Sequence, residues 1–560
     1  MLLVVGAVLL IVGYLALTPL GYLLWGTFFD EGGFTLRFFE EALSQQDFAE
    51  VALTSFAFSG GATVLAMVIG CALAYLLVRT DIALKRVIFA GSLVPLIVPS
   101  ILQVISWIFL LAPRTGFLNR IAASLSLGPF DIFSLPGMIF VEGMGLAPLV
   151  FLLMAAALRS MDPSLEESAL MSGANLNTVI RRVTLPIVRP ALFAALLIMG
   201  VHSLQAFETP AILGIPDGTW TFTSRIWNSL HGFPREFGPA GAYSVMLLAL
   251  TGVGVFLHSR LTKRSTAWQT VTGRGYRPRP IELGRWRGPL TAAALGYVVF
   301  VVVLPLMIMF FASFQPYFAA ISVAATENLS LDNYRLIFER RNILRSTQNS
   351  LVLGISSATF IMFLTAVAAW LVVRTRVAGR WVVDNLTFLP IVVPGLVMGV
   401  ALLFVYLRHP VPIYGTLWIL FIAFLTKYMP YGMRFASSSM FQIGVELEES
   451  ARMSGASWWQ SFRRIVLPLL FPGLIAGWIY VLVVSIRELS TAILVYSPGN
   501  EVLAVEIWEL WQDGRLTQLA ALGTLMVVAL LALAGLAYKI GSRIGIRETA
   551  LEPAPLPGEL

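Results

Sequence analysis

Residues 166–191 read EESALMSGANLNTVIRRVTLPIVRPA, and residues 448–473 read EESARMSGASWWQSFRRIVLPLLFPG. Thirteen of the 26 aligned positions are identical without a gap, at a constant spacing of 282 residues. Both copies are polar segments flanked by apolar runs, and packing gives a loop little reason to keep its residues. The repeat therefore predicts a duplicated chain in which both copies of this segment serve a function.

The composition indicates a membrane protein. Of the 560 residues, 58% are apolar and only 12% are charged, and the mean hydropathy is +0.82. Soluble domains carry about 25% charged residues, which excludes an ordinary soluble enzyme, a disordered protein and a nucleic-acid binder. The single cysteine, Cys71, and four scattered histidines exclude a disulfide framework and a metal cluster built from these residue types.

Twelve apolar runs are long enough to cross about 30 Å of hydrocarbon as helices. They are continuously apolar, which favours helices over a β-barrel. The predicted fold is thus an all-α membrane protein. The runs lie near 2–25, 52–78, 87–111, 133–157, 188–212, 239–258, 289–313, 349–373, 384–406, 416–438, 471–494 and 518–540.

The positions of the basic residues predict the orientation. Arginine and lysine collect after spans two, four, six, eight, ten and twelve, all on one side of the membrane. The loop 26–51 on the other side holds six acidic residues and one arginine. Positive charge marks the cytoplasmic side, so both termini are expected in the cytoplasm. The first run lacks a basic start and a cleavage site, so it reads as a retained span.

The duplication divides the chain into two parallel six-span modules. We expect the first module at 1–258 with a cytoplasmic loop at 159–187, and the second at 289–545 with a loop at 441–469. A cytoplasmic linker at 259–288 joins them, and a cytoplasmic tail follows at 546–560.

Each repeated loop is expected to form a pair of helices. Ser164 and Glu167 have the spacing of a capping box, which predicts a helix over about 165–172. Gly173 can end that helix in a left-handed conformation. A second helix is expected up to Leu185, with a turn at Pro186. In the second copy, Glu446 takes the place of Ser164 and the capping box is lost.

The loop pattern resembles the "EAA" loop of permease subunits of binding-protein-dependent ABC importers. Its motif is E-x-A-x-x-x-G, nine residues, then a hydrophobic residue, x and L-P. The residues that carry it are Glu167, Ala169, Gly173, Val183, Leu185 and Pro186, and again Glu449, Ala451, Gly455, Ile465, Leu467 and Pro468. Ser168 and Ser450 stand where the family has alanine, and both are small.

The resemblance implies a transport subunit and not an enzyme. In this family the loop forms a coupling helix that docks into a groove of an ATP-binding subunit. The chain has no G-x-x-x-x-G-K-[ST] motif, so ATP and Mg are expected on two copies of a separate cytosolic subunit. A solute-binding protein is expected on the outer side, and the bacterial inner membrane is the expected location.

Five ionisable residues fall within or near the apolar runs, where they are costly. They are Glu142, Glu208, Lys427, Arg487 and Glu488. Two interpretations stay open for them. They can pair with one another, for example Lys427 with Glu142 across the two halves, or they can line a translocation pathway. No metal ligands are assigned.

The cargo and the energy source have alternatives. The fused layout resembles ferric-iron uptake permeases, while fused permeases for thiamine, and those for phosphonates or polyamines, are similar. The outer segments 213–238 and 495–517 can form a docking rim for the delivery protein or plain connecting loops. A secondary transporter driven by an ion gradient also suits twelve spans with buried charges.

Overall fold

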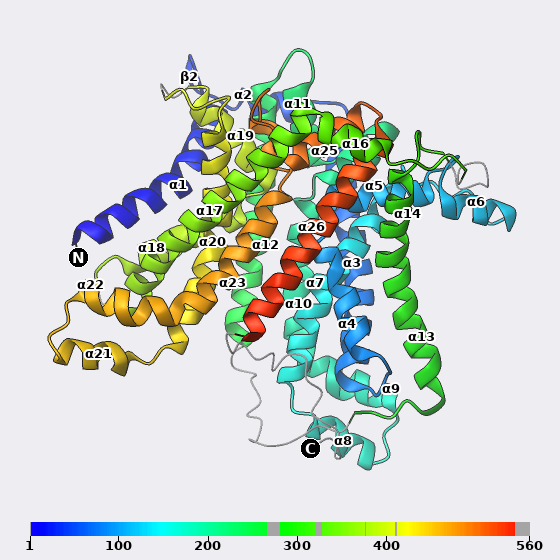
Figure 1. The fold of residues 1–560 in the computed structure, drawn as a ribbon, viewed down its shortest axis with the longest axis horizontal. Helices are drawn as coiled ribbons and strands as arrows, with labels where there is room; N and C mark the ends of the chain where they lie inside the picture. The colour runs from blue at the N-terminus through cyan, green and yellow to red at the C-terminus, as the bar shows by residue number, and fades with distance from the viewer. Residues whose placement is uncertain (1, 266–279, 320–326, 376, 409–410, 544–560) are drawn as a thin grey trace. The chain divides into compact units, whose positions relative to one another are not determined.

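The computed structural model describes residues 2–265, 280–319, 327–375, 377–408 and 411–543 (Figure 1). These residues are almost entirely helical, and one short antiparallel pair joins β1 (Phe29–Asp30) to β2 (Gly33–Phe34). Contacts divide them into two compact units. The first unit holds the described residues of 1–45, 225–248 and 331–547, and the second holds those of 46–224 and 249–330.

The second unit contains most of the first half of the sequence. Its helices are α3 (Phe48–Arg79), α4 (Lys85–Leu93), α5 (Ser100–Leu111), α6 (Phe117–Ser124), α7 (Leu135–Ser160), α8 (Ser164–Met171), α9 (Leu176–Val179), α10 (Leu185–Leu204), α13 (Arg287–Val298) and α14 (Leu304–Ser313). Helices α3 and α7 pack side by side, and Ala66, Ala74, Ala147 and Val150 are buried in their shared core.

The first unit contains most of the second half. Its elements are α1 (Leu2–Phe28), α2 (Arg37–Leu43), α16 (Asp332–Glu339), α17 (Arg341–Arg374), α18 (Arg380–Phe388), α19 (Gly395–Tyr406), α20 (Leu417–Gln442), α21 (Val445–Met453), α22 (Trp458–Ser461), α23 (Leu467–Ile486), α24 (Ala492–Val495), α25 (Leu503–Gln512) and α26 (Leu516–Arg543). Helices α11 (Phe222–His231) and α12 (Phe237–Ser265) contain residues of both units.

Within the described residues, nine helices are long and apolar enough to span a membrane singly. Two further helix pairs meet the same criterion together but bend sharply, by 105° between α4 and α5 and by 109° between α18 and α19. The continuous helices predicted over 87–111 and 384–406 are therefore wrong. Two prolines four residues apart flank each break: Pro95 and Pro99 between α4 and α5, and Pro390 and Pro394 between α18 and α19. Each proline removes a helical N–H donor. The predicted tenth span corresponds to α20.

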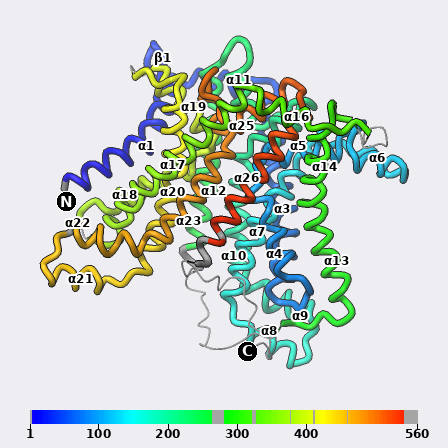
Figure 2. Tube along the Cα trace, viewed as in Figure 1, coloured from blue at the N-terminus to red at the C-terminus, as the bar shows by residue number. Residues whose placement is uncertain are grey.

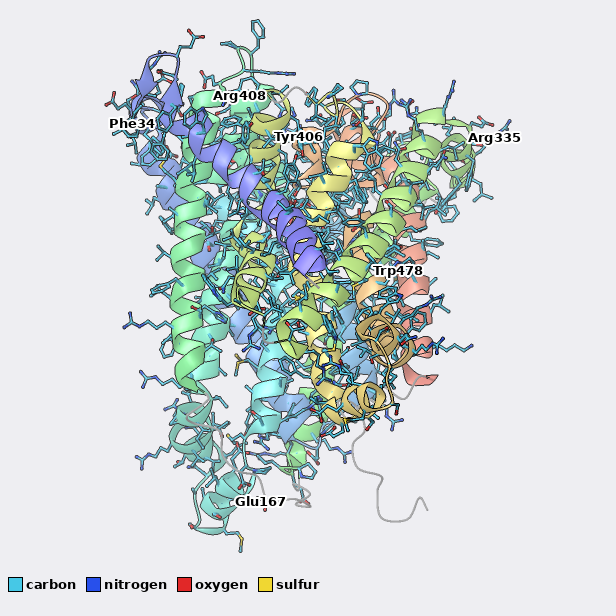
Figure 3. All side chains as sticks on the ribbon, turned by 90° about the vertical axis from the view of Figure 1, so that its left-hand side faces the viewer. Phe34, Glu167, Arg335, Tyr406, Arg408 and Trp478 are labelled. Atoms are coloured by element: carbon cyan, nitrogen blue, oxygen red, sulfur yellow. The ribbon has the colours of Figure 1, made fainter. Side chains whose placement is uncertain are left out.

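Each unit takes its first membrane helix from the other half of the sequence. Helix α1 packs against α18 and α19, and the Tyr14 and Tyr406 hydroxyls are 2.8 Å apart (Figures 2 and 3). In the other unit, α13 and α14 pack against α4 and α5, and Val298 joins the α3–α7 core. The compact units thus cut across the sequence repeat, because the first span of each half finds its apolar partner in the other.

Two predicted segments fall largely or wholly outside the description. Residues 266–279 of the expected linker and the whole expected tail, 546–560, lie outside the described residues. The described end of the linker does make contacts in the second unit, where the backbone N–H of Ile281 donates to the carbonyl of Arg79 at 2.8 Å.

Candidate functional site: the two coupling loops

The first repeated loop folds into a short helix followed by a long one. Helix α8 begins at Ser164 with Pro163 at the N-cap, and Gly173 has a φ of +85°. Such a φ suits glycine, so the expected left-handed end is confirmed. The predicted capping box is wrong, because Ser164 lies inside the helix and its N–H donates to Asp162 at 3.0 Å.

The second loop repeats this geometry. Helix α21 begins after Gly444, and Gly455 ends it with a φ of +84°. No atom lies within 4 Å of a Cβ built on either Gly173 or Gly455. Both helix ends therefore present open backbone on the surface of their unit, with room for another surface to approach.

The turn predicted at Pro186 is not present. The chain stays helical from Leu176 to Leu204, and residues 180–184 widen into a single π turn. The same turn occurs at 462–466, just before Pro468. Because proline lacks an N–H, the wider turn before it lets the helix continue without the missing hydrogen bond.

A buried ion pair holds each candidate coupling helix, α8 or α21, to its own unit. Arg79 is the last residue of α3, and its Nε lies 3.1 Å from Oε2 of Glu166 on α8. Arg374 is the last residue of α17, and its Nε lies 3.2 Å from Oε1 of Glu448 on α21. All four side chains are buried, so both charges of each pair depend on their partner.

The two arginines also bind the ends of the helices that lead into the loops. Arg79 donates to the carbonyls of Leu158 and Met161 at 2.9 and 3.3 Å, at the end of α7. Arg374 donates to the carbonyls of Met440 and Ile443 at the end of α20. Each arginine therefore joins three elements: the second span of its half, the fourth span and the coupling helix.

The carboxylates have a second contact that differs between the halves. Glu166 accepts a hydrogen bond from the Thr184 hydroxyl, in the π turn before α10. Glu448 accepts one from the indole N–H of Trp370 at 3.4 Å, on α17. The first contact ties the coupling helix to the fifth span, and the second strengthens its link to the second span.

Each coupling helix presents a large apolar side chain away from its unit. Met171 and Met453 occupy the same repeat position and are each 90% exposed. Leu165 and Leu447, also equivalent, are exposed on the same helices. Exposed apolar groups clustered beside polar ones mark an interaction surface. Figure 3 shows Glu167 on α8 at the far end of its unit.

The motif residues lie at or near this surface. Gly173, Leu185, Pro186, Glu449, Gly455 and Pro468 are exposed, and Glu167, Ala169, Ala451 and Leu467 are partly exposed. The buried partners of the arginines are Glu166 and Glu448, one position before the motif glutamates. The motif glutamate therefore faces outward while its neighbour holds the helix in place.

The intramembrane charges of the second half form one cluster. The Lys427 ammonium pairs with Glu488, and the Tyr428 hydroxyl donates to the same carboxylate at 2.6 Å. The backbone N–H of Thr491 donates to it as well, at 2.9 Å. Lys427 thus has a carboxylate partner, Glu488, within its own unit, and the suggested pairing with Glu142 stays a prediction.

The first half holds a simpler site at the matching place. The Glu142 carboxylate on α7 accepts a hydrogen bond from the Thr209 hydroxyl at 2.7 Å. Glu208 directly precedes Thr209 in the sequence. Thr209 and Thr491 are separated by the repeat spacing of 282 residues. Both follow the end of a fifth span, α10 or α23, where the helix is interrupted and Arg487 caps α23.

Interrupted backbone at membrane depth needs protein partners, because lipid offers no hydrogen bonds. The carboxylate of Glu488 supplies part of that need, because it accepts from the backbone N–H of Thr491, whereas Glu142 accepts from the side-chain hydroxyl of Thr209. These contacts establish pairing within each half, and the role of the five charges in a pathway stays a prediction. Within the described ranges, no group of three or more His, Cys, Asp or Glu side chains is placed to hold a metal ion.

Sequence comparison identifies the family of the whole chain. The profile described as "Binding-protein-dependent transport system inner membrane component" matches residues 62–267 and again residues 350–543. The chain belongs to this family. Each match includes one coupling loop with its arginine–glutamate pair. The protein is therefore a multi-pass membrane permease of the ABC transport type, built as two fused modules.

Named relatives cover the chain to different extents. The ferric transport system permease protein FbpB of Actinobacillus pleuropneumoniae is 25% identical over 538 residues, which are 94% of this chain and 76% of that protein. The spermidine/putrescine transport system permease protein PotC of Escherichia coli K12 is 27% identical over 195 residues, 35% of this chain and 73% of that protein. Ferric transport permeases are thus matched over both modules.

A solved structure is also similar. It is the crystal structure of a bacterial alginate ABC transporter in complex with an alginate pentasaccharide-bound periplasmic protein. The matched chain has a TM-score of 0.39 and 19% sequence identity, and the match covers 46% of this chain and 96% of that chain.

Proposed function

We propose that this permease imports ferric iron, delivered by an extracytoplasmic solute-binding protein, using ATP hydrolysed by two copies of a separate cytosolic subunit. The observation that carries the proposal is the pair of coupling helices. Each presents an exposed methionine, Met171 or Met453, and each is anchored by a buried ion pair to spans of its unit. An exposed apolar group on a fixed helix is suited to a groove in a partner protein.

The anchoring supports a mechanical role. When the two ATP-binding subunits close on ATP, a docked coupling helix must move with them. The Arg79–Glu166 and Arg374–Glu448 pairs would pass that displacement to the second and fourth spans of each half. The expected result is alternating access, in which the cavity between the spans changes its open side.

The assignment of iron as cargo depends on the share of this chain that each relative matches. The ferric transport permease of Actinobacillus pleuropneumoniae matches 94% of the chain, whereas the polyamine permease matches 35%. A duplicated permease is therefore the form shared with the ferric transport protein. Thiamine, phosphonates and polyamines are the competing cargoes.

The test is uptake into proteoliposomes that contain the full chain, its ATP-binding subunit and its binding protein. Radioactive ferric iron, thiamine, a phosphonate and spermidine are offered one at a time, with ATP inside or outside. We expect iron uptake that requires the binding protein and ATP on the side of the coupling loops. Uptake of another cargo would contradict the iron assignment. Uptake without nucleotide, driven by an ion gradient, would contradict the ABC mechanism.

A further inference from the structure

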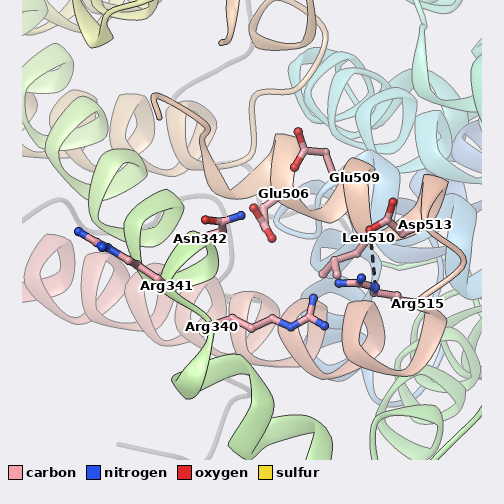
Figure 4. Close-up of a pocket in the computed structure, with 8 residues that line it drawn as sticks. All are labelled: Arg340, Arg341, Asn342, Glu506, Glu509, Leu510, Asp513 and Arg515. Carbon is pink, nitrogen blue, oxygen red and sulfur yellow. Dashed lines mark ion pairs between the residues drawn. The ribbon is translucent and has the colours of Figure 1, made fainter. Parts of the chain in front are cut away.

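The first unit contains a polar pocket at the end opposite its coupling helix. Its volume is about 370 Å³, and it is lined by the start of α17, by α25 and by the turn between α25 and α26 (Figure 4). Helix α17 runs 34 residues from Arg341 at this pocket to Arg374 at the coupling helix, a distance of about 50 Å at 1.5 Å per residue. That length exceeds the hydrocarbon thickness, so the pocket lies on the other side of the membrane from α21.

The buried ionisable side chain of this pocket is Glu506. It is only 5% exposed, and its Oε2 has no hydrogen-bond partner among the described residues. Burying a carboxylate without a donor is costly, and the usual solutions are protonation or a cationic partner. The Oε2 atom of Glu506 thus lacks a hydrogen-bond donor or a cationic partner among the described residues, and Glu506 lines the pocket.

Two of the neighbouring arginines form ion pairs with carboxylates other than Glu506. Arg345 pairs with Glu501 at 3.1 Å, and Arg515 with Asp513 at 3.6 Å. Figure 4 shows the Arg341 side chain directed away from Glu506. The pocket is lined by three acidic groups, Glu506, Glu509 and Asp513, and by three arginines, Arg340, Arg341 and Arg515, and Glu506 is the most buried of the six.

We propose that this pocket receives a basic side chain, lysine or arginine, from the solute-binding protein, and that Glu506 is its counter-charge. The proposal rests on the proposed function, since it requires that a binding protein docks on this side. A side chain fits better than a free cation for two reasons. The arginines of the lining oppose any cation, and a side chain held on a docking surface has the binding energy of the rest of that surface to offset the repulsion, which a mobile cation lacks. The acidic groups also do not converge as metal ligands among the described residues.

Protonation of Glu506 would control the docking. Burial, followed by the charges of Glu509 and Glu501, raises the pKa of Glu506 to about 7, while Arg340 and Arg345 oppose the shift. The pKa of Glu509 is raised too, by burial and by Glu501, against a hydrogen bond from Tyr496. Asp513 at the C-cap of α25, Arg341 at the start of α17 and Arg515 just before α26 line the same pocket. A basic group binds the ionised carboxylate, so affinity should rise as the pH passes upward through 7.

The experiment measures binding between two purified components. The full chain with its ATP-binding subunit is placed in nanodiscs, and the probe is the ferric-iron-binding protein that supports uptake in the proteoliposome assay. Affinity is measured at pH 6 and pH 8 for the wild type, for Glu506→Gln and for Glu339→Gln. Glu339 is a matched control, because it is an exposed glutamate on α16 whose ion pair in the described part of the chain is with its helix neighbour Arg335.

We expect the wild type to bind several-fold more tightly at pH 8 than at pH 6. Glu506→Gln should weaken binding about tenfold at pH 8 and remove the pH dependence, because the amide carries no charge. Glu339→Gln should behave as the wild type. Wild-type affinity in Glu506→Gln would overturn the proposal.

A double-mutant cycle identifies the inserted group. Each surface lysine and arginine of the binding protein is changed to glutamine and tested against both forms of the permease. At one position of the binding protein, the change to glutamine should lower the affinity for the wild-type permease about tenfold. The same change should not lower the affinity for Glu506→Gln any further. If no lysine or arginine of the binding protein shows a coupling energy with Glu506, the pocket does not receive a basic side chain and the proposal is wrong.

Two other outcomes are separable. If millimolar Ca²⁺ or Mg²⁺ raises the thermal midpoint of the wild type but not of Glu506→Gln, the pocket is a small-cation site and the proposal is wrong. If the wild type neither binds the protein nor transports, the proposed function fails and this proposal falls with it. Transport by the wild type together with unchanged binding by Glu506→Gln rejects the pocket alone.

Discussion

The Arg79 guanidinium at the end of α3 and the Glu166 carboxylate on α8 form a buried ion pair, with Nε and Oε2 3.1 Å apart. Arg374 and Glu448 reproduce it in the second half at 3.2 Å. Neither coupling helix is long enough to be stable alone, since helices of eight or nine residues are marginal in water. The ion pairs therefore both position the helices and connect them to the membrane spans.

Breaking one of these pairs should uncouple ATP hydrolysis from transport. Removing one partner of a buried pair costs about 3–5 kcal/mol, because the other charge stays buried. We expect Glu166→Gln to lower transport strongly, and the swapped pair Arg79→Glu with Glu166→Arg to recover part of it. The measurements are uptake into proteoliposomes and binding-protein-stimulated ATPase activity, each compared with the amount of ATP-binding subunit that copurifies.

A control for this prediction is the exposed pair Arg37–Glu41, whose disruption should change little. Normal transport in Glu166→Gln would show that the pair has no coupling role. Loss of the whole membrane protein from the preparation would instead show that its role is in folding.

The exposed methionines should determine docking of the ATP-binding subunit. Met171→Asp or Met453→Asp places a charge where an apolar contact is expected, so copurification of that subunit should fall about tenfold or more. Insertion of the spans should be unaffected, because both side chains are 90% exposed in the unit itself. Tyr317→Asp, another exposed position, serves as control. Undiminished copurification would place the docking surface elsewhere.

The glycines that end the coupling helices give a related prediction. Gly173→Trp or Gly455→Trp should abolish binding of the ATP-binding subunit, because a large side chain would occupy the open surface and strain a φ near +85°. Gly173→Asn separates the two causes, since asparagine tolerates this φ and adds less volume. Copurification at the wild-type level in the tryptophan variants would contradict the docking role.

Lys427 should matter for transport beyond its pairing with Glu488. Lys427→Ala leaves Glu488 buried with only Tyr428 and Thr491 as donors, so we expect a lower thermal midpoint and impaired uptake. The double variant Lys427→Met with Glu488→Gln removes both charges and should recover the midpoint. Uptake should stay low in that variant. Recovery of uptake as well would make the pair purely structural.

Helix α1 allows a comparison of two glycines in one helix. A Cβ on Gly26 would lie 2.5 Å from the Phe404 ring, whereas nothing lies within 4 Å of one on Gly21. Gly26→Ala should destabilise the docking of α1 on α19 by about 1–3 kcal/mol through overpacking. Gly21→Ala should be neutral or stabilising by up to about 1 kcal/mol, because alanine favours the helix. Thermal midpoints in detergent check this, and equal midpoints would mean that α1 does not pack as described.

Part of the missed machinery had a signal in the sequence. Residues 74–80 read AYLLVRT and residues 369–375 read AWLVVRT, so the two anchoring arginines lie in a second repeat. Glu166 and Glu448 lie within the quoted repeat itself. What the sequence did not reveal is that these residues meet, because about 80 residues separate each arginine from its glutamate. The breaks at Pro99 and Pro394 were also readable from paired prolines, yet the apolar runs around them continue without a change in hydropathy.

The sequence by itself determined the class of the protein, its duplication and the position of the two repeated loops. Apolar length, repeat spacing and local helix-ending glycines are properties of the chain that need no long-range contact. Only the tertiary structure decided which first helix joins which unit, which arginine holds which glutamate, and that Lys427 pairs with Glu488. Those choices depend on the complementary shape and charge of segments far apart in sequence, and such complementarity exists only once the helices have packed.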